Sequence, residues 1–413
     1  MLLCRQKIRR TIMDNSEKPH SFRTSGTNLR KAKTHNHSVV LEVIRTQGPI
    51  SRTKISQVTS LSRQTIQNIV ALLEELDLVR MTASKIVGRG HPGMEVCLNK
   101  DAALSFGIHV DRTRATAVVC NLDGRKIWES VCDLTSTTSD AANSAIATLV
   151  SGFRDEHSNL YPTVVGCGLA AAGPFGIRNA PKGDPTNFHE FGTPENLALL
   201  EQQLGLPIVL ENDATAAAVG EGFYGAGKGL DNFAFLQFGV GLGAGLVLKG
   251  DPYAGTFGNA GEIGHVVVEL GGEACPCGNF GCLERYLSID ALCRCLSLPG
   301  DDIATFTKIA DLVSARDKTV IDWIDAAIPR FHQAVNILEA MLDAETIIIG
   351  GTAPENFLNL LIEKATPFLG SLSQRSDDKR IRNGAAGLSS IALGASAVSM
   401  NAHFAPSVSR LVL

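Results

Sequence analysis

A short glycine-rich segment places four metal-binding side chains close together in the chain. His265, Cys275, Cys277 and Cys282 all fall within residues 265–282. One imidazole and three thiolates form a closed, soft donor set that suits a single tetrahedral zinc ion. Because four protein ligands leave no position for water, the zinc would be structural. Such closure contributes about 10–16 kcal/mol in small zinc peptides. The alternative is four unconnected residues in a cysteine-containing loop.

The composition indicates a globular protein of two or three domains. The chain has 413 residues, of which 44% are hydrophobic, so it can bury a sizeable core. No apolar run approaches eighteen residues, and the N-terminus lacks the apolar centre of a signal peptide. We therefore expect a soluble, cytoplasmic protein that makes no membrane contact. Cysteines such as Cys120 and Cys167 lie in apolar strings, which is typical of reduced, buried thiols.

The net charge of −4 conceals a strong asymmetry. Residues 1–100 hold 17 Lys and Arg against 7 Asp and Glu, whereas the rest of the chain holds 21 against 35. The basic part is therefore the candidate for binding a polyanion. Residues 1–35 show no apolar periodicity and are predicted to be a disordered basic tail. For this tail, a merely solvated segment is the alternative.

Residues 36–100 show the pattern of a winged helix-turn-helix. An apolar helix stops at Gly48-Pro49, Ser51 and Ser62 are placed as N-caps of two further helices, and the last helix buries apolar residues at helical spacing. Its outer face would read bases in the major groove. The candidate DNA-binding residues on this face are Arg63, Gln64, Gln67 and Asn68.

Two short strands follow, around Leu78–Arg80 and Glu95–Leu98, and they flank a basic glycine-rich tip that contains Arg89. Strand, tip and strand complete a wing, and Arg89 is a further candidate for DNA contact. The alternative is a small helical packing module that does not bind nucleic acid.

From residue 104 the pattern is that of an α/β protein with two similar halves. Phe106–Val119 and Phe233–Leu248 look like two copies of one β-hairpin. We expect a first lobe over residues 104–220 and a second lobe over residues 221–400. The apolar helix Ser389–Met400 is expected to return to the first lobe.

Three polar residues follow an apolar strand at Glu211-Asn212-Asp213. Ligands of open α/β sheets bind at the carboxyl ends of strands, so Asn212 and Asp213 are candidate ligand contacts. Capping of the next helix is the alternative, and the two roles are compatible because each uses one face of the side chain.

The string Glu262-Ile-Gly-His265, followed by Cys275-Pro-Cys-Gly-Asn-Phe-Gly-Cys-Leu-Glu284, resembles the signature of the ROK family of repressors and sugar kinases. The resemblance covers about residues 36–400 and includes a Gly-Arg-Gly-x-Pro wing, as in ROK repressors. It implies a winged helix-turn-helix followed by a two-lobed, actin-like (sugar kinase-like) ATPase fold. It also implies zinc on the histidine and cysteines. The sugar contacts that it implies are Asn187, Asn212, Asp213, Glu262, His265 and Glu284.

The nucleotide side departs from the kinase pattern. ROK kinases carry Gly-Ile-Asp-x-Gly-Gly-Thr-Lys in the first phosphate loop, whereas this chain has His109 for the aspartate and Asp111-Arg112 for the glycines. The second turn, Gly239–Gly245, is intact. Because phosphoryl transfer depends on positioning and on neutralising phosphate charge, we expect no catalysis. Asp213, which matches the family's general base, would be vestigial.

These features predict a sugar-responsive transcriptional regulator, and a repressor of carbohydrate-related genes is the favoured form. Its partners would be operator DNA and a sugar or sugar derivative, and it would act as a homodimer or higher oligomer. One alternative is an active ROK kinase that phosphorylates a hexose or N-acetylhexosamine with ATP. Another is a regulator whose effector is a phosphotransfer protein or other partner.

Overall fold

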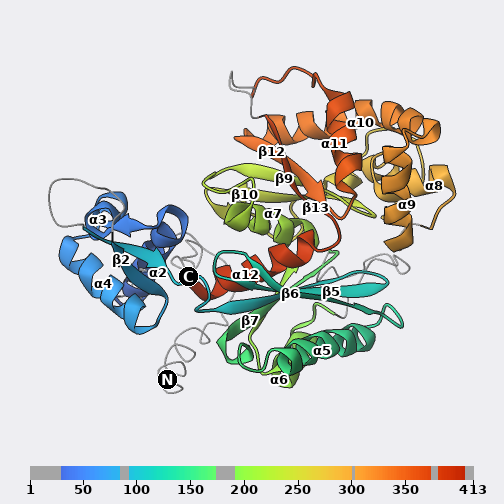
Figure 1. Ribbon diagram of the computed structural model, residues 1–413. Coiled ribbons are helices and arrows are strands. Elements are labelled where there is room, and N and C mark those ends of the chain that lie inside the picture. The colour runs from blue at the N-terminus through green and yellow to red at the C-terminus, as the bar shows by residue number, and fades with distance from the viewer. Residues whose placement is uncertain (1–28, 84–92, 174–190, 300–302, 374–379, 405–413) are drawn as a thin grey trace.

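The computed structural model describes residues 29–83, 93–173, 191–299, 303–373 and 380–404, which form a winged domain and two α/β lobes (Figure 1). Arg89 and Asn187 lie outside the described residues. Among the residues that are described, no helix is long and apolar enough to cross a membrane. All cysteines in this part of the chain are free thiols, as expected.

The winged domain is a three-helix cluster with a three-stranded sheet. Its elements are α2 (Leu29–Gln47), α3 (Arg52–Thr59), α4 (Arg63–Glu75), β1 (Ile50–Ser51), β2 (Val79–Ala83) and β3 (Met94–Leu98). The strands run in the order β1-β3-β2, all antiparallel. Ser51 and Ser62 cap α3 and α4 by accepting hydrogen bonds from the backbone N–H groups of Lys54 and Thr65, which confirms the predicted helix starts.

Two details of this domain differ from the sequence-based expectations. Helix α2 begins at Leu29, so residues 29–35 are helical and do not belong to a disordered tail. Leu, Arg, Lys and Ala are strong helix formers, which explains the extension. Strand β1 was not predicted, because two residues are too few to show the alternation of apolar and polar side chains that indicates a strand.

The two lobes repeat one sheet topology. Their sheets have the orders β6-β5-β4-β7-β8 and β11-β10-β9-β12-β13, each with an antiparallel hairpin side and two further parallel strands. The first sheet comprises β4 (Leu104–Val110), β5 (Arg114–Asn121), β6 (Lys126–Asp133), β7 (Val164–Ala171) and β8 (Ile208–Asn212). The second comprises β9 (Phe233–Phe238), β10 (Leu242–Leu248), β11 (Asp251–Pro252), β12 (Thr346–Gly351) and β13 (Ile381–Ala386). The predicted duplication of the hairpin is therefore confirmed.

Helices cover both faces of each sheet. The outer helices of the first lobe are α5 (Ser139–Glu156) and α6 (Pro194–Leu204). Those of the second are α8 (Ile289–Leu296), α9 (Ile303–Ser314), α10 (Lys318–Leu342) and α11 (Glu355–Ala365). Between the lobes lie α7 (Asp213–Tyr224) and α12 (Ser390–Phe404), which pack against each other (Figure 1).

The inner helices belong to different sheets. Helix α12 lies on the first sheet, as predicted, while α7 lies on β9 and β10 of the second. The sequence interpretation placed residues up to 220 in the first lobe, whereas α7, which begins at Asp213, packs on the second sheet. Helix α7 is buried along nearly its whole length, so its sequence carries no amphipathic stripe that would show which sheet it covers.

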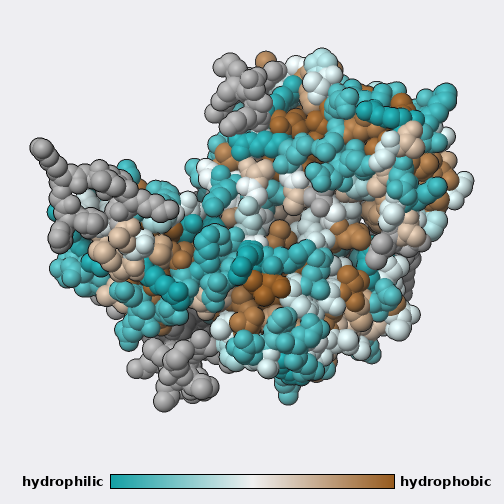
Figure 2. Space-filling view, in the orientation of Figure 1, coloured by the Kyte–Doolittle hydropathy of each residue, from teal (hydrophilic) through white to brown (hydrophobic). Residues whose placement is uncertain are grey.

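On the face shown in Figure 2, hydrophilic side chains cover much of the winged domain, and a notch separates this domain from the second lobe.

Candidate metal centre and ligand-binding cleft

The metal-type loop is held in shape by backbone contacts. His265 ends the short 3-10 helix Ile263–His265, and isolated β-bridges join Val267 to Cys282 and Ala274 to Phe280. Gly281 has a φ of +77°, and a Cβ there would lie 1.6 Å from the carbonyl oxygen of Glu269. This turn therefore requires glycine.

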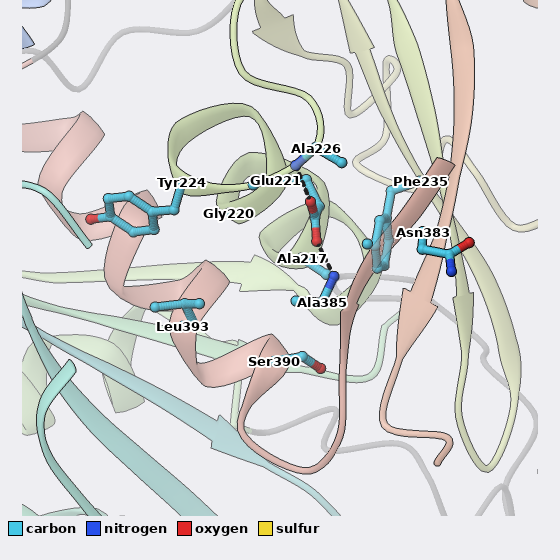
Figure 3. A pocket seen from close by; sticks show the side chains of 12 residues that line it. Ala217, Gly220, Glu221, Tyr224, Ala226, Phe235, Asn383, Ala385, Ser390 and Leu393 are labelled. Atoms are coloured by element: carbon cyan, nitrogen blue, oxygen red, sulfur yellow. Dashed lines mark hydrogen bonds between the residues drawn. The ribbon is translucent and has the colours of Figure 1, made fainter. Parts of the chain in front are cut away.

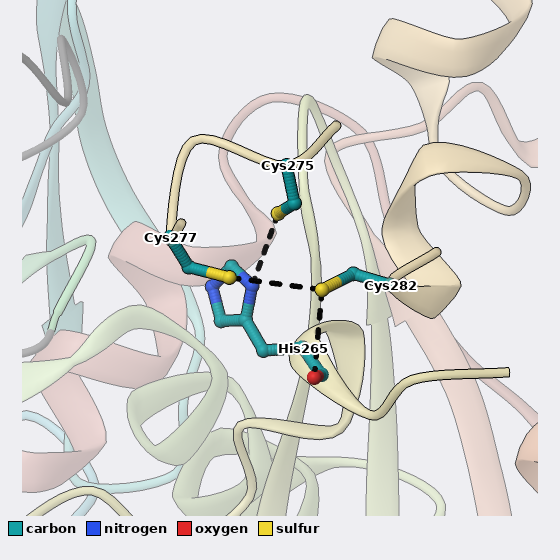
Figure 4. A group of neighbouring side chains, drawn as sticks. All are labelled: His265, Cys275, Cys277 and Cys282. Carbon is teal, nitrogen blue, oxygen red and sulfur yellow. Dashed lines mark hydrogen bonds between the residues drawn. The ribbon is translucent and has the colours of Figure 1, made fainter. Parts of the chain in front are cut away.

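The four predicted metal ligands come together (Figure 4). Their ligand atoms all lie within 4.8 Å of one another. The Sγ atoms of Cys277 and Cys282 are 3.6 Å apart, and Cys275 Sγ lies 3.6 Å from His265 Nδ1. A tetrahedral zinc with Zn–S bonds of about 2.3 Å places neighbouring sulfurs about 3.8 Å apart. One nitrogen and three sulfurs at this spacing fit zinc.

Apolar packing contributes little to the order of this loop. Leu270 is 95% exposed and Phe280 is 57% exposed, and only Cys275 and Cys282 of its cysteines are buried. A bound metal would therefore supply much of the cross-linking that the loop lacks.

Carboxylates lie near both ring nitrogens of His265, and Glu284 Oε1 also accepts a hydrogen bond from Cys275 Sγ at 3.3 Å. Its Nδ1 lies 3.5 Å from Glu284 Oε1, and its Nε2 lies 3.9 Å from Glu262 Oε2. Burial raises the pKa of Glu262, the His265 ring lowers it, and the nearby carboxylates of Asp213 and Glu284 raise it further. Glu262, His265 and Glu284 thus lie together, and Asp213 is near enough for its charge to raise the pKa of Glu262.

Asn212 and Asp213 lie where the chain passes from the first lobe to the second. Asn212 Oδ1 accepts hydrogen bonds from the backbone N–H groups of Ala214 and Thr215, so Asn212 caps α7 as the alternative interpretation expected. Asp213 Oδ1 also accepts from Ala214 N, at 2.7 Å. Burial raises the pKa of the Asp213 carboxyl above its ordinary value, despite the opposing effects of His109 and of these hydrogen bonds.

Gln237 is a buried residue beside Asp213 that the sequence interpretation missed. Its Nε2 donates to Asp213 Oδ2 at 2.9 Å, and its buried Oε1 has no hydrogen-bond partner among the described residues. Gln237 is a polar residue near the carboxyl end of β9, just before Gly239. This position is the signal that would have found it.

The two phosphate-type turns differ. In the second turn, Gly239 N donates to Gly241 O, and a Cβ on Gly241 would lie 3.3 Å from Glu284 Oε2. In the first turn, Asp111 Oδ1 accepts from Arg112 N, and Arg112 Nε is buried without a partner among the described residues. Asp111 and Arg112 thus stand at positions that glycines hold in the kinase pattern.

The predicted DNA-reading residues share one exposed face. Arg63, Gln64, Gln67 and Asn68 are all exposed on α4, and the buried side of this helix is formed by its apolar residues. Gln64 Nε2 donates to Asn68 Oδ1 at 3.2 Å. This exposed bond can be exchanged for bonds to bases at small cost.

A winged helix-turn-helix attached to two sugar kinase-like lobes defines a class of protein, the transcriptional regulators built on a kinase fold. Comparison with known sequences agrees, because the ROK family profile matches residues 105–401. The chain belongs to the ROK family.

Named relatives include repressors. The chain is 27% identical over 266 residues to the xylose repressor of Bacillus subtilis (strain 168), covering 64% of this chain and 68% of the relative. It is 24% identical over 343 residues to the DNA-binding transcriptional dual regulator NagC of Escherichia coli (strain K12), covering 79% and 83%.

Solved structures give the same fold. A ROK family transcriptional regulator, a homolog of the E. coli MLC protein, superposes with a TM-score of 0.71 at 23% identity, covering 92% of this chain and 99% of that one. A ROK family glucokinase from Streptomyces griseus, in complex with glucose and AMPPNP, gives a TM-score of 0.61 at 25% identity, covering 72% and 100%. The first covers the winged domain as well as the lobes.

Proposed function

We propose that this protein is a transcriptional repressor of carbohydrate-related genes, in which a sugar or sugar derivative bound between the lobes changes the affinity of the winged domain for its operator. One observation carries the proposal. The polar residues Glu262, His265, Glu284 and Asp213 lie close enough to influence one another, while Asp111 and Arg112 replace the glycines of the first phosphate turn. The names of the relatives support the same function.

Each cleft residue has a role in this proposal. Glu262 and Glu284 would accept hydrogen bonds from sugar hydroxyls, and Asn212 would donate through its amide, since its Oδ1 is used in capping. Asp213 would accept from the hydroxyl that faces it, and Asn187, which lies outside the described residues, is proposed as a further contact. A structural zinc, held by His265 and the three thiolates, would fix the orientation of the His265 ring between the metal and the neighbouring carboxylates.

The DNA-binding roles are proposed in the same way. Gln64, Gln67 and Asn68 would pair with bases and Arg63 with guanine or phosphate, while Arg89 would contact the DNA backbone from the wing. A homodimer would place two winged domains on two half-sites, since operator symmetry mirrors protein symmetry in such regulators.

Sugar kinase activity is the second candidate, because Asp213, at the position of the kinase base, directly follows β8 and the glucokinase has the same fold. A base is insufficient for phosphoryl transfer, which requires a clamp that neutralises phosphate charge. Asp111 adds negative charge at the first turn, and Arg112 places a large side chain where the kinase pattern has glycine. We therefore propose that the cleft binds sugar without transferring phosphate to it.

Selection of binding sites from random duplex DNA tests this function. The full chain is expected to enrich one DNA sequence. D-xylose, N-acetyl-D-glucosamine or another sugar of a broad panel is expected to reduce the fraction of that DNA which the protein retains. Enrichment of no sequence, or retention that no binding sugar changes, would contradict the proposal.

A further inference from the structure

The two inner helices are each fixed to a different lobe. Helix α12 lies against neighbouring glycines of the first sheet, Gly107 and Gly168, where added Cβ atoms would lie 1.9 and 1.8 Å from carbonyl oxygens of α12. Ser105 Oγ also bonds to Ser396 Oγ at 2.7 Å. These contacts make α12 part of the first lobe.

Helix α7 is fixed to the second lobe with similar closeness. A Cβ on Gly245 of β10 would lie 2.1 Å from the carbonyl oxygen of Ala214. Near the other end of the helix, the Glu221 carboxylate accepts hydrogen bonds from the backbone N–H groups of Ala226 and of Ala385 on β13 (Figure 3). Helix α7 should therefore move with the second sheet.

The helices touch each other through glycine. A Cβ on Gly220 of α7 would lie 2.7 Å from Gly394 Cα on α12, and one on Gly394 would lie 2.2 Å from Ala216 O. The side chains that flank this crossing are mostly small, among them Ala216, Ala217 and Ala395, so the two helix backbones lie close together. A cavity of about 300 Å³ lies beside it, lined by residues of α7, β9, β13 and α12 (Figure 3).

The winged domain packs mainly on the first lobe. Its core includes Ala103 just before β4, Leu122 of the first lobe and Met400 at the end of α12. Val165 of β7, Phe223 of α7 and Phe404 pack against this cluster. A domain held in this way would follow the first lobe when the angle between the lobes changes.

Arg45 of the winged domain reaches the second lobe. Its guanidinium donates to Phe223 O on α7 at 2.9 Å and lies 3.9 Å from the centre of the Phe223 ring. Glu42 holds the same guanidinium with bonds of 2.8 and 2.7 Å, and the Arg45 side chain is only 7% exposed. A cation at the last turn of a helix is favoured by the unpaired carbonyl groups there.

We propose that Arg45 is a positioning residue that ties the winged domain to the carboxyl end of α7, so that a change in the angle between the lobes shifts the DNA-reading helix. Helix α7 has 12 residues and spans about 18 Å, with Asp213 of the cleft at one end and the turn held by Arg45 at the other. This inference rests on the proposed sugar response, because sugar binding supplies the change in angle.

The test compares operator affinity with and without saturating sugar in the full chain. The probes are D-xylose and N-acetyl-D-glucosamine, with the selected operator measured by fluorescence anisotropy and sugar binding by calorimetry. In the wild-type protein, sugar should change operator affinity at least about fivefold. In Arg45→Ala the ratio of operator affinity without sugar to operator affinity with sugar should lie within about twofold of one. The affinity for sugar should stay unchanged.

Two further variants make the result specific. Arg45→Met keeps a long side chain over the Phe223 ring and removes the bond to Phe223 O, so its operator affinity should also no longer respond to sugar. This variant tests the proposal even if Arg45→Ala fails to fold. Arg154→Ala is the matched control, because Arg154 also lies over an aromatic ring, Tyr161, but within the first lobe. It should keep the wild-type ratio.

The outcomes separate the two claims. A wild-type response that survives in Arg45→Ala and Arg45→Met overturns the role of Arg45 and leaves the proposed function intact. A wild-type protein that binds a probe sugar without any change in operator affinity refutes the proposed function and the role of Arg45 together.

Discussion

Replacing Asp213 with Asn should stabilise the protein and weaken sugar binding at the same time. The substitution keeps the shape of the side chain and removes its charge. Burial raises the pKa of the Asp213 carboxyl, which means that the folded state disfavours the ionised form relative to the unfolded chain. At neutral pH the carboxylate therefore costs folding free energy, and the neutral amide avoids that cost.

The hydrogen bonds change little in the Asp213→Asn variant. The amide oxygen of the new side chain can still accept from Ala214 N, and the amide nitrogen can donate to Gln237 Oε1 once the Gln237 amide is turned, since that oxygen has no partner among the described residues. The loss of a carboxylate from the first turn of α7 costs about 0.3–1 kcal/mol. The raised pKa indicates that the free-energy cost of burying the charge is larger than this favourable interaction with the helix. For sugar, one hydrogen bond to a charged group is worth about 1.5–3 kcal/mol, so affinity should fall roughly 10–100-fold.

Denaturant unfolding from pH 4 to pH 8 tests the stability claim, with calorimetry for sugar binding. The stability advantage of Asp213→Asn should be absent at low pH, grow as pH rises above the ordinary carboxyl pKa of 3.8, and become constant above the raised pKa. A variant that is less stable than the wild type at pH 7.5, by a margin independent of pH, would refute this reasoning.

Three further predictions concern the other parts of the molecule. Gln64→Ala with Asn68→Ala should abolish sequence selectivity and leave salt-sensitive DNA binding; unchanged enrichment of one site in a selection experiment would contradict this. Cys277→Ser should lower zinc content below one ion per chain and weaken the sugar response; elemental analysis that finds no zinc in native, chelator-free wild type would remove the claim. Purified protein with ATP and a sugar panel should release no ADP above background in a coupled assay, whereas turnover near about 1–100 per second that Asp213→Asn abolishes would establish a kinase.

Much of the winged domain could be predicted because its signals are local. Ser62 and the buried residues Ile66, Ile69, Val70 and Leu73 mark the start and inner face of α4 within one stretch of chain. The metal-type loop was predictable for the same reason, since its ligands lie within residues 265–282 and their chemistry is specific.

Features that depend on distant contacts could not be predicted. The bond from Arg45 to Phe223 joins residues 178 positions apart, and nothing in either local sequence indicates the partner. Gly107 and Gly168 are ordinary strand glycines in the sequence, and only the parallel pairing of β4 with β7 places them side by side under α12. The place of Gln237 near the carboxyl end of a strand can be read from the sequence, but its hydrogen bond to Asp213, 24 positions away, cannot.

The central claim is that sugar and operator binding are coupled, and coupling between two sites must be reciprocal. Calorimetric titration of the full chain with its sugar, alone and saturated with the selected operator duplex, measures this most directly. The proposed repressor should bind sugar at least about fivefold more weakly when it holds the operator, by the same factor with which sugar weakens operator binding. Equal sugar affinity in both titrations would contradict the claim.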